Sequence, residues 1–187
     1  MQPVNYYIYK IFHRYKMDQN NQPNPNEIPR YCGISTFARL RTLGDISNNS
    51  QIDTMILGVP FDNGCTFRVG ARFGPEAIRQ SSRLIRNFNI NQNKSPFDNK
   101  IVIDGGDLNI TPFNINQAVD QIYNQLLEKY KFANNIILMG GDHTISYPSL
   151  KAINRKHGKV ALLHFDSHFD TWDEYFGEKC THGTPFK

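Results

Sequence analysis

Four apolar runs, separated by helical patterns, constrain the fold of this sequence more than any other feature. They occupy residues 54–60, 100–106, 135–141 and 159–166. Each run is almost continuously apolar rather than alternating, which is typical of parallel strands that are covered on both faces. We therefore predict four buried parallel strands.

Helical patterns fill the intervals between these runs. The segment 74–88 opens with Pro75, which suits the first turn of a helix. The segment 114–130 places apolar residues at three- and four-residue steps, and the segment 144–158 ends in a glycine. The alternation of strands and helices predicts an α/β domain built on a parallel sheet.

Size and charge limit the classes of protein to consider. With 187 residues and a net charge of +4, the chain fits one domain, and its Lys and Arg residues are scattered rather than clustered. No apolar run reaches the length of a membrane-spanning helix. Three widely spaced cysteines form neither a disulfide framework nor a zinc motif, which indicates a reducing compartment. We expect an intracellular protein that binds neither nucleic acid nor membrane.

The N-terminal residues 1–20 differ from the rest of the chain. Residues 1–17 contain no acidic side chain, a weak resemblance to a mitochondrial presequence, but they lack serine and are rich in aromatic residues. We interpret residues 1–20 as a disordered extension or a weak presequence, and residues 21–187 as part of a single domain. The compartment is left open between cytoplasm and mitochondrion.

Polar, glycine-rich segments follow the predicted strands. They are "DGGD" (104–107), "GGDH" (140–143) and "DSHFD" (166–170), and the first strand leads into a glycine-rich loop at 61–75. In parallel sheets the binding crevice lies beyond the carboxyl ends of the strands. These segments are therefore expected to meet at one functional edge.

The spacing of Asp166, His168 and Asp170 indicates a metal site. In an extended segment residues two apart point the same way, so three potential ligands would converge, and His143 would join them from another strand end. Two imidazoles with at least two carboxylates suit Mn²⁺, and less strictly Fe, Co, Ni or Zn. An excess of carboxylate suggests a pair of ions, which could activate a water molecule.

Other polar residues near these segments have more than one interpretation. Asp142 alone is best explained as a helix cap, and His164 fits either a supporting role beside the ligands or a core position. Cys65 is expected to be a small buried residue rather than a nucleophile. Trp172 and Tyr175 could line the mouth of the site or simply pack.

Three longer motifs carry a specific resemblance. They are "GVPFDNGCTFRVGARFGPEAIR", "MGGDHTISYPSL" and "HFDSHFDTWDEYFGEKCTHGTPF". Together they resemble the ureohydrolase family, the arginase and agmatinase group, and the first loop and the "HGTPF" segment favour the agmatinase branch. The resemblance extends from about residue 21 to the end of the chain.

This resemblance implies a three-layer α/β/α fold with two Mn²⁺ ions at the strand ends. It implies that His143 and Asp170 bind one ion, that His168 binds the other, and that Asp166 bridges them. His182 would bind the substrate and assist proton transfer. The implied reaction is hydrolysis of a small guanidino substrate, agmatine plus water giving putrescine plus urea, in polyamine biosynthesis. A homo-oligomer is also implied.

The resemblance further implies elements that the 187 residues do not contain. The family's second metal-binding segment, an Asp-x-Asp on a later strand, and the last strands of the sheet would lie beyond Lys187. Residues 21–187 therefore correspond to the N-terminal portion of a ureohydrolase domain. Two alternatives stay open: hydrolysis of another substrate, such as guanidinobutyrate, arginine or a formimino compound, or a catalytically inert chain, for which we expect no measurable urea release.

Overall fold

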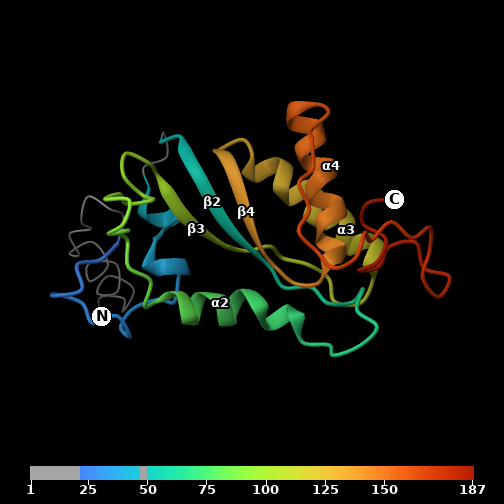
Figure 1. The fold of residues 1–187 in the computed structure, drawn as a ribbon, viewed down its shortest axis with the longest axis horizontal. Helices are drawn as coiled ribbons and strands as arrows, with labels where there is room; N and C mark the ends of the chain where they lie inside the picture. The colour runs from blue at the N-terminus through green and yellow to red at the C-terminus, as the bar shows by residue number, and fades with distance from the viewer. Residues whose placement is uncertain (1–21, 47–49) are drawn as a thin grey trace, which may run out of the picture.

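The computed structural model describes residues 22–46 and 50–187, and Figure 1 shows their arrangement around a central sheet. The prediction for residues 1–20 lies outside the described residues. In the part that is described, no helix is both long enough and apolar enough to cross a membrane.

The sheet contains four parallel strands in the order β1-β3-β2-β4. The strands are β1 (Arg41–Thr42), β2 (Ile52–Val59), β3 (Val102–Asp107) and β4 (Ala133–Gly140). Three of the four predicted strands are confirmed as β2, β3 and β4. The two-residue strand β1 was not predicted, because its sequence is too short and too polar to show a strand pattern.

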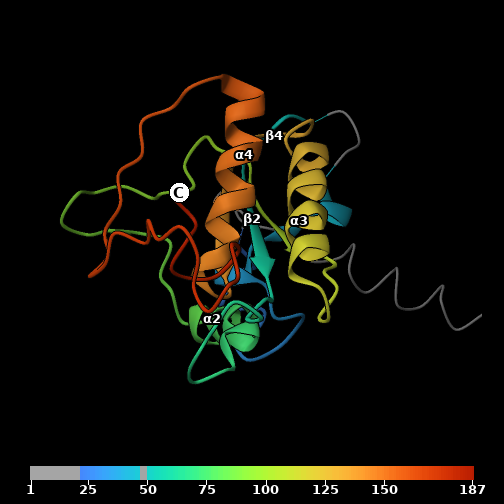
Figure 2. The same ribbon diagram turned by 90° about the vertical axis from the view of Figure 1, so that its right-hand side faces the viewer.

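Helices cover both faces of the sheet, which confirms the three-layer architecture (Figure 1). Helices α3 (Ile115–Lys129) and α4 (Ser146–His157) pack side by side on one face (Figure 2). The main core contains Ile122 and Leu126 of α3 together with Met55 and Leu57 of β2. Helix α2 (Gly74–Ser82) lies over the other face, next to the short 3₁₀ helix η1 (Phe37–Arg39). Three further 3₁₀ helices connect these elements: η2 (Leu43–Asp45), η3 (Ala71–Phe73) and η4 (His143–Ile145).

Helix α2 ends six residues before the predicted end of its pattern at residue 88. The Ser82 hydroxyl donates to the carbonyl of Arg79 (2.7 Å) and accepts from the backbone N–H of Ala38 (2.8 Å). A serine side chain that bonds to the backbone competes with continued helix. Beyond it Leu84 is 73% exposed, so no buried face supports another turn.

The prediction of a strand at 159–166 is wrong for this structure. After α4 the chain runs as a loop without regular secondary structure, and among the described residues no strand pairs with the outer edge of β4 (Figure 2). Leu163 is 78% exposed and Phe165 is 88% exposed. A parallel strand is stabilised by layers on both faces. The described residues leave Leu163 and Phe165 uncovered and provide no neighbouring strand, so the apolar composition of this segment is not enough to fix it in the sheet.

Candidate metal centre

The first wall of the site forms where β4 turns into η4. Gly141 has φ +77°, and a Cβ there would lie 2.4 Å from the carbonyl oxygen of Val59, so only glycine fits this turn. The Asp142 side chain accepts from the backbone N–H of Thr144 (2.8 Å), which confirms its predicted role as a cap. This turn places His143 at the carboxyl edge of the sheet.

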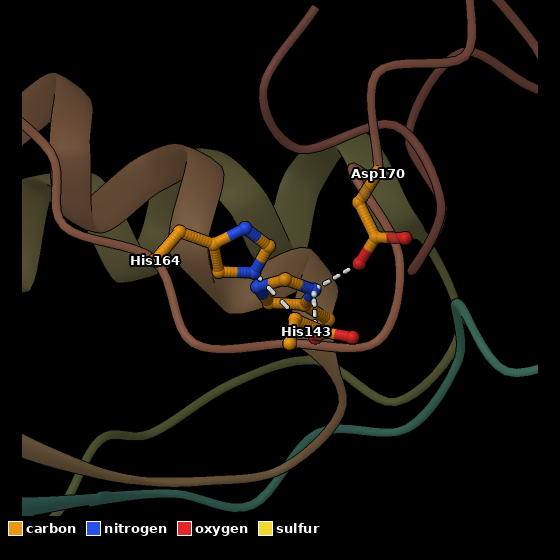
Figure 3. A group of neighbouring side chains, drawn as sticks. His143, His164 and Asp170 are labelled. Atoms are coloured by element: carbon orange, nitrogen blue, oxygen red, sulfur yellow. Dashed lines mark hydrogen bonds and ion pairs between the residues drawn. The ribbon is translucent and has the colours of Figure 1, made fainter.

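The loop after α4 brings three more potential ligands to His143. One ligand atom from each of His143, His164, Asp166 and Asp170 lies within 4.8 Å of the others. Figure 3 shows the two imidazole rings lying one over the other, with their centroids 5.3 Å apart, and the Asp170 carboxylate pointing at the His143 ring. The structure therefore brings together three of the four predicted ligands and adds His164.

Asp166 lies at the centre of this group. Its carboxylate oxygens approach the ring nitrogens of His164 (3.5 Å), His168 (3.7 Å) and His143 (3.8 Å). The backbone N–H of His168 donates to Asp166 (3.0 Å) and lowers the pKa of that carboxyl below its ordinary value. Asp166 is thus kept ionised and available to a cation.

His168 lies at the rim of the site rather than within the group. Its side chain is 81% exposed, although its Nδ1 atom is near Asp166. The prediction that His168 points the same way as Asp166 and Asp170 assumed an extended strand. The chain bends at residues 166–168, and Asp170 adopts a positive φ of +52°. The ligand role of His168 stays a prediction.

The donor set fits a divalent cation. Two imidazoles and two carboxylates provide nitrogen and oxygen ligands of the kind that Mn²⁺ and neighbouring transition metals accept. The Nε2 atom of His164 is buried and makes no hydrogen bond in the described part of the chain, although an Asp166 oxygen lies 3.5 Å away. A buried ring nitrogen without a partner is costly unless something else fills that role. A bound ion would fill it.

His182 and Phe186 connect the C-terminal "HGTPF" segment to this site. The Nδ1 atom of His182 lies 2.6 Å from the carbonyl oxygen of Gly64, in the loop that follows β2. The Phe186 ring packs edge-on against the rings of His143 and His164, with centroids 5.2 and 4.7 Å away. Sequence reasoning missed Phe186, because a lone aromatic residue gives no signal of what it will contact.

An ion pair organises the loop 61–75, which forms the second wall. The buried Asp62 carboxylate accepts from the backbone N–H of Gly70 (2.8 Å) and from Arg72 Nε (2.6 Å). The Arg72 guanidinium holds the pKa of Asp62 below its ordinary value. Burial raises the pKa of the Cys65 thiol in the same loop, which keeps it protonated and a poor nucleophile.

A second buried ion pair fixes the sheet beneath the site. Arg79 of α2 donates to Asp104 at 2.8 and 3.0 Å and to Asp107 at 2.5 Å. Their contacts join α2 to the end of β3, which is a structural role.

Fold and site together define an α/β protein with a candidate metal centre beyond the carboxyl ends of its parallel strands. The model of the arginase family matches residues 52–187. The chain is 43% identical over 178 residues to guanidinobutyrase of Pseudomonas aeruginosa, covering 91% of the chain and 54% of that relative. It is 37% identical over 168 residues to mitochondrial agmatinase of Gallus gallus, covering 90% of the chain and 48% of that relative.

Solved structures agree with these sequence relationships. Proclavaminate amidinohydrolase from Streptomyces clavuligerus matches with a TM-score of 0.78 at 38% identity, over 85% of the chain and 53% of that protein. Formiminoglutamase of Trypanosoma cruzi with Mn²⁺ matches with a TM-score of 0.65 at 26% identity, over 75% of the chain and 48% of that protein. The chain belongs to the arginase family. It spans about half the length of the curated relatives it matches.

Proposed function

We propose that the full-length protein hydrolyses the C–N bond of a small guanidino compound, and that agmatine is its substrate. The reaction adds water to the guanidino carbon and releases urea and putrescine. The observation that carries this proposal is the group formed by His143, His164, Asp166 and Asp170 at the carboxyl edge of an arginase-family sheet.

His143, Asp166, Asp170 and His168 are the residues that we propose to hold a pair of Mn²⁺ ions. When bound, such ions supply Lewis acidity and lower the pKa of water. The carboxyl groups of Asp166 and Asp170 would also offset the positive charge of a guanidinium group. The two carboxylates would thereby reduce the repulsion between a positively charged guanidinium group and the metal ions.

His182 is the residue that we propose to meet the substrate. An imidazole can orient a guanidinium through its acceptor nitrogen and can hold a proton for the departing amine, which needs one to leave. The loop 61–75 supports it, since Gly64 contacts both the backbone and the ring of His182.

Guanidinobutyrate is the second candidate substrate. It is favoured by the 43% identity to a guanidinobutyrase, which exceeds the 37% identity to an agmatinase. The two compounds share the guanidino group and differ at the far end, where agmatine carries an ammonium and guanidinobutyrate a carboxylate. Selection between them therefore depends on charge at the outer part of the site.

The experiment is a substrate panel on the full-length protein loaded with Mn²⁺. Urea release is measured for agmatine, guanidinobutyrate and arginine at matched concentrations, and the kcat/KM values are compared. A kcat/KM for agmatine at least about tenfold above the others, or about 1.4 kcal/mol in transition-state binding, supports the proposal. A preference of that size for guanidinobutyrate would replace agmatine by the second candidate, and no urea from any of them would refute guanidino hydrolysis.

We also propose a homo-oligomeric assembly and an intracellular location, cytoplasmic or mitochondrial. The intracellular location is supported by the names of two relatives, the mitochondrial guanidino acid hydrolase of Homo sapiens and the mitochondrial agmatinase of Gallus gallus. Sedimentation of the purified protein and imaging of a tagged form test these two points.

A further inference from the structure

Gly64 is held from both sides by residues that lie far from it in the sequence. Its backbone N–H donates to Oδ2 of Asp142 (2.8 Å), and its carbonyl accepts from the backbone N–H of His182 (3.3 Å). The same carbonyl oxygen lies 2.6 Å from Nδ1 of the His182 ring. One residue therefore joins the turn after β4 to the "HGTPF" segment.

The contact with a carbonyl determines where the ring proton of His182 lies. A carbonyl oxygen can only accept, so Nδ1 must carry the hydrogen. In the neutral ring the other nitrogen, Nε2, is then the acceptor. The Gly64 carbonyl thus selects the tautomer that leaves Nε2 free to accept a proton or a hydrogen bond.

Asp142 holds Gly64 in the position that this contact requires. Its Oδ1 accepts from the backbone N–H of Thr144, and the backbone N–H of Asp142 donates to the carbonyl of Phe61 (2.7 Å). Asp142 is therefore anchored both to the turn after β4 and to the loop 61–75. Asp142 is itself buried. Helix capping explains the bond to Thr144, but it does not require the second bond, to Gly64.

Close packing at Gly64 supports the same conclusion. A Cβ at this position would lie 2.0 Å from the Thr144 hydroxyl oxygen and 3.1 Å from Oδ2 of Asp142. A side chain at this position would require the peptide or the buried Thr144 side chain to move. The close approach of Gly64 to Asp142 and His182 therefore depends on glycine.

We propose that Asp142 is a positioning residue that, through Gly64, holds His182 in the Nδ1–H tautomer with Nε2 available to the substrate. The consequence for catalysis rests on the proposed function, whereas the tautomer itself does not. Asp142 acts on proton transfer without contacting the substrate.

The first experiment observes the tautomer directly in the 187-residue chain. Long-range ¹H–¹⁵N spectra at a pH where the ring is neutral distinguish Nδ1–H from Nε2–H histidine. We expect His182 in the Nδ1–H form in the natural chain, and a shift to mixed tautomers or to Nε2–H in Asp142→Ala. Asp45→Asn is the matched control, because Asp45 also accepts a backbone N–H, from Thr42 (2.8 Å), but at an exposed turn away from the site.

A folded Asp142→Ala chain in which His182 keeps the Nδ1–H form would overturn the proposal. Should that variant fail to fold, Asp142→Asn gives the answer, since it keeps the shape of the side chain but has one acceptor oxygen for two backbone donors. We then expect a mixture of tautomers in Asp142→Asn, and an unchanged spectrum would refute the role of Asp142.

The second experiment separates positioning from metal binding in the full-length protein. We expect Asp142→Asn to lower kcat about tenfold or more with KM and Mn²⁺ content little changed, because general acid–base catalysis contributes factors of this order. A loss of activity that follows Mn²⁺ content alone, with the tautomer unchanged, would contradict the proposal. If the natural protein releases no urea, the proposed function fails while the tautomer measurement still decides the role of Asp142.

Discussion

At the scale of single residues, Asp166 is the central carboxylate of the candidate metal centre. Three imidazole rings approach its carboxylate within 3.8 Å, from His143, His164 and His168. A backbone hydrogen bond keeps it ionised by lowering its pKa. The bridging role that was predicted from family resemblance is therefore compatible with the position of Asp166 among the rings.

Substitution of the central ligands should weaken metal binding. In the full-length protein, Asp166→Asn and His143→Ala should each raise the dissociation constant for Mn²⁺ by about tenfold or more, because each removes a ligand that no other described side chain replaces. Titration calorimetry measures the change. His157→Ala is the control, since His157 lies at the end of α4 and packs against Tyr130. Unchanged affinity in His143→Ala would show that the ligand set is wrong.

The two remaining histidines allow a sharper test. We expect His168→Ala to reduce the bound Mn²⁺ from two ions to one, because His168 is the imidazole that we propose would hold the second ion. His164→Ala should keep both ions, with one of them bound more weakly, because His143, Asp166 and Asp170 still surround that position. Metal content after gel filtration gives the stoichiometry. If His164→Ala loses an ion and His168→Ala does not, His164 is the ligand and the prediction for His168 is wrong.

At the scale of elements, the loop 61–75 depends on the ion pair between Asp62 and Arg72. The pKa of Asp62 is lowered in the folded protein, so its carboxylate stabilises the fold above the ordinary pKa near 3.8, and this contribution is lost as the pH falls through the lowered value. Asp62→Asn should cost about 1–3 kcal/mol of unfolding free energy at pH 6–7, because the N–H donors of Gly70 and Arg72 lose a buried, charged acceptor.

Denaturant titrations of both chains at pH 7 and pH 3 test this assignment. The difference in unfolding free energy between the natural chain and Asp62→Asn should be largest at neutral pH and should shrink at acid pH. A difference that is constant over this range, or that grows on acidification, would show that Asp62 is not the charged partner of Arg72.

The segment 159–166 shows which features of an element can be predicted from sequence. The runs 54–60 and 135–141 form strands because each has a neighbouring strand to pair with and packs against the helix layers. The run at 159–166 has the same apolar pattern, but among the described residues it finds neither. A local pattern records the tendency to form a strand, whereas the partners that fix it are contacts distant in sequence.

The site residues were predictable to a similar degree. The spacing of Asp166 and Asp170 after an apolar run predicted the site, and the glycines before His143 predicted its first wall. The participation of His164 could have been inferred only from its shared parity with Asp166. The contacts of Gly64 and Phe186 depend on the tertiary arrangement and leave no mark on the local sequence.

Hydrogen exchange tests whether the segment 159–166 is an unpaired loop in the 187-residue chain. Backbone amides of residues 160–165 should exchange far faster than those of Met55 and Leu57, because the latter lie in a paired and buried strand. Mass spectrometry of exchanged peptides gives the comparison. Protection of 160–165 equal to that of β2 would show that the segment pairs with the sheet after all.

At the scale of the whole molecule, the sheet order places both walls of the site at one edge. The loop after β2 and the turn after β4 meet because β2 and β4 are neighbours in parallel register, with Val59 opposite Gly140. Arg79 and its two aspartates fasten α2 to the end of β3 beneath them. The fold thus brings a glycine-rich loop, the turn that carries His143 and the "HGTPF" segment into contact, although they are distant in sequence.

The most direct test of the central claim is metal-dependent urea release by the full-length protein. The protein is stripped of metal with a chelator, and urea formation from agmatine and guanidinobutyrate is measured before and after addition of Mn²⁺, with Asp166→Asn treated in parallel. We predict no urea from the stripped protein, recovery on addition of Mn²⁺, and no recovery in Asp166→Asn. Urea release that is unaffected by stripping, or a natural protein that binds Mn²⁺ and releases no urea from any guanidino compound, would contradict the account.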